Sequence, residues 1–176
     1  MSLGVTAGLT AVAIQTAADG LTINFVAPGG MAIAGPLLSA GLWYHVAMTL
    51  APAPGGTLVV GYLNGKQVAS TLYATALANY TEITVGGGAA SGGAACLFAE
   101  TCAWARALGP VEIAHHYAYR MPNRKGLIAY GKFDGLNSGD AYLDASGNPV
   151  VTWVIHRTVT QGSLPPPTRP MYQPRA

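Results

Sequence analysis

The sequence predicts an all-β fold, an antiparallel sandwich with one short helix. Short runs rich in β-branched and aromatic residues recur at regular intervals along the chain. Gly, Pro, Asn or Asp bounds each run, and an Asn-Gly pair separates two of them. This spacing is typical of a β-sandwich, because each short strand is followed at once by a turn.

Six runs are expected to form strands, at 21–26, 43–50, 57–63, 66–73, 81–87 and 95–105. Asn64 and Gly65 lie between the third and the fourth, and a type I′ turn requires the positive φ angles that these residues tolerate. A tight hairpin is therefore predicted there. The segments 51–56 and 86–95 are predicted to be looser connections.

The run "WYHVAMTL" indicates which face of its strand is buried. Val46, Met48 and Leu50 alternate with smaller or polar residues and therefore share one face. We expect this face to line the core. The two arms of the following hairpin mix apolar and polar groups on both faces, which is expected if the outer face is covered as well.

One helix is predicted over 109–120, "GPVEIAHHYAYR". Gly109 suits the N-cap, the proline after it suits the first helical position, and Glu112 lies in the first turn, where the helix dipole favours a carboxylate. Ile113 and Tyr117 are four residues apart and are expected to anchor the helix to a sheet.

The chain is predicted to form one domain over 1–160 and an extended arm over 161–176. The arm is rich in proline, so it cannot join a central strand and is expected to adopt polyproline II. No export signal is expected, because the N-terminal segment lacks a basic region. No run is apolar for long enough to predict a transmembrane helix.

The motifs "WYHVA", "YLNG", "ITVGG" and "RALGPVEI" follow one another within 41–117. In this order they resemble the concanavalin A-like, laminin-G-like jelly-roll family. The resemblance implies a jelly roll whose matching residues build the framework. These residues are Trp43, His45, Val46, Ala47, Tyr62, Asn64, Gly65, Gly86, Arg106, Ala107, Leu108, Glu112 and Ile113.

Two departures from the family matter. The segment 126–148 is similar to the strand and loop that begin such a module, yet here it follows the helix. Residues 126–160 are therefore expected either to be circularly permuted within the sandwich or to be exchanged with a neighbouring subunit. Calcium-binding members use acidic rim loops, which this chain lacks, so no metal site is expected.

Enzymatic activity is not expected. Glycoside hydrolases with this fold need two carboxyl groups about 5–9 Å apart, and the chain has only 7 acidic residues. The densest acidic group is Asp134, Asp140 and Asp144, in a Gly-rich segment typical of turns. We therefore predict no catalytic residue, no cofactor and no metal ligand.

The histidines and cysteines give no ligand pattern. His115 and His116 are adjacent on the predicted helix and point in different directions, while His45 and His156 are solitary in the sequence. All four are expected to be structural or surface residues, because a metal-binding helix needs two ligands four residues apart.

The two cysteines are expected to be small core residues. Cys96 and Cys102 would lie about 20 Å apart on a single strand. A disulfide needs Cα atoms within about 7 Å. We therefore predict that they do not bridge and that both pack as small hydrophobic groups.

The composition favours a protein that is covered by partners. Charged residues make up 9% of the chain and hydrophobic residues 51%, against roughly 25% charged residues in an ordinary soluble domain. Net charge is +2, and the densest basic run, 120–125, is too sparse to predict nucleic-acid binding.

From these features we expect a non-enzymatic, homo-oligomeric structural subunit of a virion, a decoration or cement protein of a tailed-bacteriophage capsid. It would be made in the host cytoplasm and bind the major capsid protein or other virion subunits. The expected contact residues lie in the arm: Pro165, Pro166, Pro167, Arg169, Pro170, Met171 and Tyr172.

The alternative function is a carbohydrate-binding, lectin-like module that adheres to glycans. Such sites stack a sugar ring on an exposed aromatic side chain and bind its hydroxyl groups with nearby polar groups. The candidate aromatic residues are Tyr44, Tyr73, Tyr80, Trp104 and Tyr130.

Overall fold

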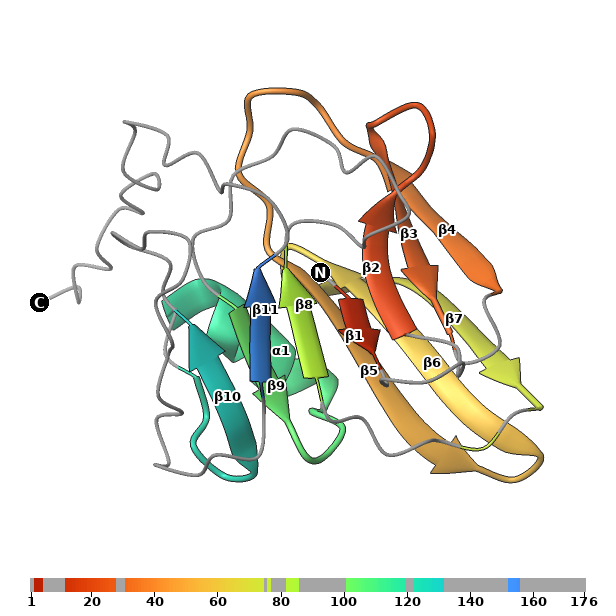
Figure 1. Cartoon of the computed structure of the whole chain (residues 1–176), viewed down its shortest axis with the longest axis vertical. Helices are drawn as coiled ribbons and strands as arrows, with labels where there is room; N and C mark the ends of the chain where they lie inside the picture. Colours follow the sequence, from red (N-terminus) through yellow and green to blue (C-terminus); the bar gives the residue numbers. More distant parts are fainter. Residues whose placement is uncertain are drawn as a thin grey trace, which may run out of the picture.

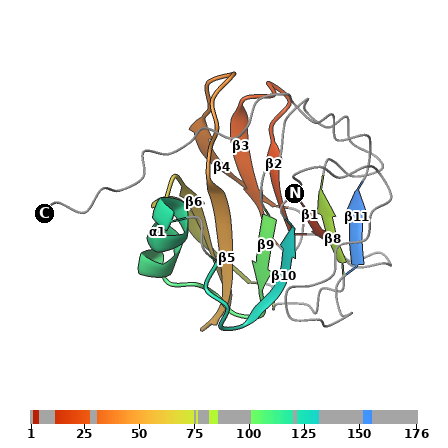
Figure 2. The ribbon, with the colours of Figure 1, turned by 90° about the vertical axis from the view of Figure 1, so that its left-hand side faces the viewer.

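The chain is an all-β sandwich, as predicted, with one short helix in the part that the structure describes (Figures 1 and 2). The computed structural model describes residues 2–4, 12–27, 31–74, 76, 82–85, 101–119, 122–131 and 152–155. The elements in chain order are β1 (Ser2–Gly4), β2 (Val12–Thr16), β3 (Thr22–Val26), β4 (Ala32–Leu37), β5 (Val46–Ala53), β6 (Gly56–Leu63), β7 (Lys66–Tyr73), β8 (Glu82–Val85), β9 (Thr101–Trp104), α1 (Pro110–Tyr119), β10 (Leu127–Gly131) and β11 (Thr152–Ile155).

Among the described strands, two sheets form the layers of the sandwich. One has 6 strands in the order β11-β8-β1-β2-β3-β4, and the other has 3 strands in the order β5-β6-β7. Strands β9 and β10, which are separated in the chain by α1, form a two-stranded antiparallel sheet. Neighbouring described strands are antiparallel except β8 and β11, which are parallel. Helix α1 lies outside the three-stranded sheet (Figure 2).

The core between the sheets is centred on Phe25 of β3, which is fully buried and packs with the buried residues Ile14 and Ile23. Val46 and Met48 of β5 pack against this cluster from the other sheet. The predicted inward face of β5 is therefore confirmed for these two residues.

Gly61 of β6 lets the two sheets approach closely at Phe25. A Cβ atom at position 61 would lie 2.5 Å from the Phe25 ring, far inside normal van der Waals contact. No larger residue fits there without displacing the ring. The glycine at this position is therefore required by packing.

A second cluster covers the outer face of the three-stranded sheet. Val60 and Tyr62 of β6 are buried against Ile113 of α1 and Leu108, which precedes the helix. The opposite face of β6 carries Gly61 and lies against Phe25. Both faces of β6 are therefore covered around Val60 and Tyr62, while Leu58 on the outer face stays exposed. This partial cover explains why the hairpin arms show no simple polar and apolar alternation.

The predicted hairpin turn is confirmed. Asn64 has φ of 50° and Gly65 has φ of 77°. The Asn64 side-chain oxygen accepts a hydrogen bond from the His45 backbone N–H at 3.0 Å, and the Asn64 N–H donates to the His45 carbonyl at 2.8 Å. The turn therefore also fixes the chain just before β5.

The prediction of a loose connection at 51–56 is wrong. Strand β5 starts at Val46 instead of residue 43 and continues to Ala53, where it pairs with Gly56 of β6. Pro52 is tolerated because, among the described strands, β5 pairs only with β6 and is an edge strand. The positive φ of Gly55, 86°, closes the tight turn.

Strand β4 is absent from the predicted strands because it contains Gly35 and Pro36, which normally break strands. Among the described strands β4 lies at the end of its sheet, so proline costs no interior pairing. A Cβ atom at position 35 would lie 2.5 Å from Cγ2 of Ile23 and 2.9 Å from Cε2 of Phe25. The glycine lets β4 pack closely over the core.

Both described strands of the segment 126–160 pair within the chain. Strand β10 pairs with β9, and β11 lies parallel to β8. The segment 86–95, Cys96 and the arm over 161–176 lie outside the described residues.

Replacing Gly61 by Ala should lower the free energy of unfolding by about 1–3 kcal/mol, because the added methyl group collides with the buried Phe25 ring. Urea denaturation followed by circular dichroism measures this loss. Ser70→Ala, at an exposed position on β7, is the matched control and should change stability by less than about 0.5 kcal/mol. Equal stability of the Gly61→Ala protein and its parent would contradict the packing.

Candidate functional site

Several residues singled out from the sequence lie outside the described residues. They are Tyr80, Asp134, Asp140, Asp144, His156, Pro165, Pro166, Pro167, Arg169, Pro170, Met171 and Tyr172. Of the described candidates, His45, Cys102 and Trp104 contact His116 of α1. Two polar groups lie at this helix. One is an ion pair at the start of the helix, and the other is a cluster of two histidines and a cysteine.

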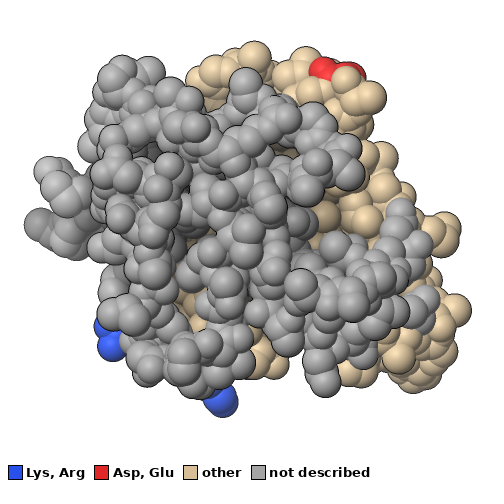
Figure 3. Space-filling view, viewed as in Figure 1, with Lys and Arg blue, Asp and Glu red and all other residues tan. Residues whose placement is uncertain are grey.

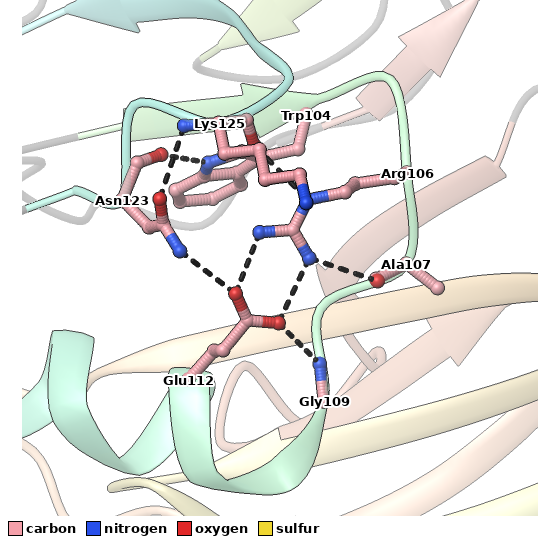
Figure 4. A network of polar contacts seen from close by, with 7 residues as sticks. All are labelled: Trp104, Arg106, Ala107, Gly109, Glu112, Asn123 and Lys125. Atoms are coloured by element: carbon pink, nitrogen blue, oxygen red, sulfur yellow. Dashed lines mark hydrogen bonds and ion pairs between the residues drawn. The ribbon is translucent and has the colours of Figure 1, made fainter.

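The ion pair joins Arg106, which follows β9, to Glu112 in the first turn of α1 (Figure 4). The two guanidinium Nη atoms donate to the two carboxylate oxygens at 2.6 and 2.8 Å. The side chains are 30% and 31% exposed. This bidentate geometry is the strong form of an Arg–carboxylate contact.

Glu112 also caps its own helix. Its Oε2 accepts a hydrogen bond from the Gly109 N–H at 3.0 Å, which is the return half of a capping box. The Gly109 carbonyl accepts from the Ile113 N–H at 3.0 Å. Gly109 is therefore the N-cap, as predicted. Hydrogen bonding from Arg106 and then from Gly109 lowers the pKa of Glu112 from 4.5 to about 2.

The chain that leads into β10 completes this network (Figure 4). The Asn123 side chain donates through Nδ2 to Glu112 Oε1 at 2.8 Å. The backbone carbonyl of Asn123 accepts a hydrogen bond from Trp104 Nε1 at 2.7 Å. Arg106 Nε donates to the Lys125 carbonyl at 3.0 Å. The network joins β9, α1 and the approach to β10, so it fixes the frame of the fold.

The second group brings together His45, Cys102 and His116. His45 Nε2 and His116 Nδ1 are 3.1 Å apart, and His116 Nε2 is 3.9 Å from Cys102 Sγ. All three side chains are half-buried. His45 is solitary in the sequence, but folding places it in contact with His116 of α1.

Aromatic rings surround the two histidines. The Trp104 ring lies edge-on to His116 with centroids 5.6 Å apart, and Tyr117 lies 5.7 Å from His45. Tyr117 also covers the hairpin turn, since a Cβ atom on Gly65 would lie 3.0 Å from its Cδ1. The cluster is therefore held between α1, the turn and β9.

The sequence carries a weak signal for this cluster. His116 lies one turn after Glu112 on the helix. Cys102 and Trp104 are two residues apart on β9 and therefore share a face of the strand. Helical and strand periodicity can therefore place each residue on a face. Neither periodicity shows that this face of α1 contacts this face of β9, or that both lie against His45.

The described aromatic residues proposed as sugar platforms are half-buried. The Tyr44 hydroxyl accepts from the Ser39 N–H at 3.0 Å, and the Tyr73 hydroxyl donates to the Met31 carbonyl at 3.1 Å. Trp104 is engaged in the network and the histidine cluster. A different aromatic residue, Tyr119, is 57% exposed, with the His115 ring 4.5 Å away.

Among the described residues, no cluster of three His, Cys, Asp or Glu side chains is suited to hold a metal ion. Within the same part of the chain, α1 is too short to cross a membrane.

The layered all-β architecture and the framework motifs define a lectin-like sandwich. The family described as the concanavalin A-like lectin/glucanases superfamily matches residues 4–114, more than half of the chain. The chain therefore belongs to this family. Comparisons with curated proteins and with solved structures gave no significant match.

Acidification should weaken the fold through Glu112. Its pKa is lowered on folding, so its stabilising contribution is complete above pH 4.5 and is lost as the pH falls toward about 2. Glu112→Gln should therefore lower the urea midpoint at pH 7 and have a progressively smaller effect between pH 4.5 and 2. Lys66→Gln, which removes an exposed charge elsewhere, is the control. A Glu112→Gln effect that stays constant over this range would contradict the assignment.

Proposed function

We propose that the chain is a non-catalytic binding domain that acts through contacts between protein surfaces, as a subunit that decorates or cements a tailed-bacteriophage capsid. The observation that carries this proposal is the exposure of large hydrophobic side chains in a chain with only 9% charged residues. These side chains are Leu21, Met31, Leu37, Leu42, Leu58, Val68, Leu72, Val111 and Tyr119.

Three of these residues form an apolar outer strip, Leu58, Val68 and Leu72, on the three-stranded sheet. Leu58 lies opposite Leu72 in the β6–β7 ladder. Leu58 is two residues from Val60 on β6, so the two side chains share one face of the strand. Val60 packs against Ile113 of α1, so this shared face is the outer one. Leu72 is 52% exposed. An uncovered apolar face of this kind is typical of a protein-interaction surface.

The low charge of the described surface supports the same proposal. On the face seen in Figure 3, the few described acidic and basic groups lie at the margins. Depletion of charge with retained apolar groups is the composition of an interface core. A subunit that binds only the assembled shell stabilises that shell by mass action.

The absence of catalysis is also part of the proposal, and the described carboxylates support it. Glu112 is bound by Arg106 and caps the helix. Asp19 accepts hydrogen bonds from the backbone N–H groups of Leu21 and Thr22 and so closes a turn. Both carboxylates serve the frame, whereas a hydrolase needs a facing pair.

Glycan adhesion is the second candidate function. The family includes lectins by its description, and Tyr119 offers an exposed ring beside His115 on α1. A ring face next to a polar group can stack on a sugar. This candidate places the site on α1, whereas the outer strip lies on β6 and β7.

Self-association through the outer strip is testable by sedimentation velocity over a range of concentrations. We expect assembled species whose fraction falls in the double variant Leu58→Ser/Leu72→Ser, because the variant removes apolar area from the contact. Tyr119→Ala is the control and should assemble like the parent. A protein that is monomeric at every concentration, and whose binding to a glycan array is lost in Tyr119→Ala, would favour the lectin-like function.

Deletion of residues 163–176 tests the proposed arm. An arm that is already extended loses little entropy on docking, so its removal should weaken binding to the particle. The amount of protein that co-sediments with phage heads should fall, while the thermal unfolding midpoint of the sandwich stays the same. Unchanged co-sedimentation would remove the arm from the mechanism.

A further inference from the structure

The cluster of His45, His116 and Cys102 has a geometry that the proposed surface contacts do not use. His116 is the central residue, with Nδ1 facing His45 at 3.1 Å and Nε2 facing Cys102 Sγ at 3.9 Å. The three side chains come from the segment before β5, from β9 and from α1. This is the order nucleophile, base and orienting group that activates a thiol.

We propose that Cys102 is a reactive thiol, with His116 as its base and His45 as a positioning residue, and that it exchanges with small disulfides. The thiolate is the reactive form of cysteine, and a neighbouring imidazolium stabilises it. The distance of 3.9 Å between Cys102 Sγ and His116 Nε2 is long for a hydrogen bond to sulfur. Contacts of catalytic bases are often long in the resting protein and shorten when the proton is transferred.

The contact between the two histidines favours the proton transfer. A single proton lies between His45 Nε2 and His116 Nδ1, because two facing N–H groups would repel each other. When that proton is on Nδ1 of His116, the Nε2 atom of His116 carries a lone pair that is directed at the Cys102 thiol. After the thiol proton has moved to His116, both N–H groups of the His116 imidazolium have acceptors. Nδ1–H faces His45 Nε2, and Nε2–H faces the Cys102 sulfur.

The surroundings hold both rings in place. Trp104 packs edge-on against His116, and Tyr117 packs against His45. The backbone of His45 is hydrogen-bonded in both directions to Asn64. Such support is what a working base requires, since a freely rotating imidazole would lose the geometry. Cys102 is half-buried, so the residue keeps some exposed surface.

A metal site is a poorer explanation of the same cluster. His116 directs opposite nitrogens of one ring at its two neighbours, so a single ion cannot bind all three side chains in this arrangement. No three-ligand cluster occurs among the described residues. The geometry is that of a proton relay.

The reaction balances without any additional oxidant. Cys102 gives its proton to His116, and the thiolate attacks one sulfur of the disulfide R–S–S–R. A new S–S bond forms to Cys102 and the original S–S bond breaks. The leaving thiolate takes up the proton held by His116. Cys102 is oxidised to a mixed disulfide, and half of the reagent is reduced to a thiol.

The test follows the reaction of the full chain with 5,5′-dithiobis(2-nitrobenzoate), a small aromatic disulfide, from pH 5.5 to 9. Cys96→Ser leaves Cys102 as the one thiol in the chain. We expect the rate to reach half its maximum at least about one pH unit below 8.5, the ordinary thiol value. His116→Gln should move this midpoint back to about 8.5, and His45→Asn should move it part of the way.

Controls separate this role from a merely structural one. His115→Gln changes the adjacent histidine, which lies on the exposed side of α1, and should leave the midpoint unchanged. Cys102→Ser in the Cys96→Ser background should abolish the reaction. The same midpoint in the parent and in a folded His116→Gln protein would overturn the proposal.

A further comparison holds even if His116→Gln fails to fold. The Cys96→Ser parent is measured in its native state and after unfolding in urea, where the cluster no longer exists. A native midpoint below the unfolded one supports the proposal. Equal midpoints, or a native thiol that does not react at any pH, would overturn it.

Discussion

The close approach of the two sheets at Phe25 is the constraint on which the rest of the structure depends. Its ring lies between the backbones of Gly35 and Gly61, where no Cβ atom fits. This contact brings the inward face of β5 onto the core, with Val46 and Met48 packed around it. On the outer face of the same sheet, α1 covers the part around Val60 and Tyr62.

The position of α1 follows from polar contacts as much as from hydrophobic burial. Ile113 enters the cluster on the outer face, but one buried residue in a helix of 10 residues is a weak anchor. The contact between Arg106 and Glu112 fixes the start of the helix, because it satisfies the capping carboxylate and joins the helix to β9. His116 is thereby placed against His45 and Cys102.

The framework and the candidate functional surfaces are therefore separate. Residues that match the family build the hairpin turn, the helix cap and the buried faces, and these roles restrict what each residue can be. The outer strip and the exposed ring of Tyr119 carry no such structural role. Binding can diverge on this fold while its frame is kept, because the frame uses interior contacts and binding uses the surface.

The sequence by itself determined the local elements: the Asn64-Gly65 turn, the helix with its Gly109 cap, and the inward face of β5. These depend on interactions within a few residues. Strand β4 and the extension of β5 escaped prediction, because edge positions tolerate the Gly and Pro that normally break strands. Only the tertiary structure decided that His45 and His116, 71 positions apart, lie in contact. Such contacts depend on how α1 crosses the sheet, which no local pattern encodes.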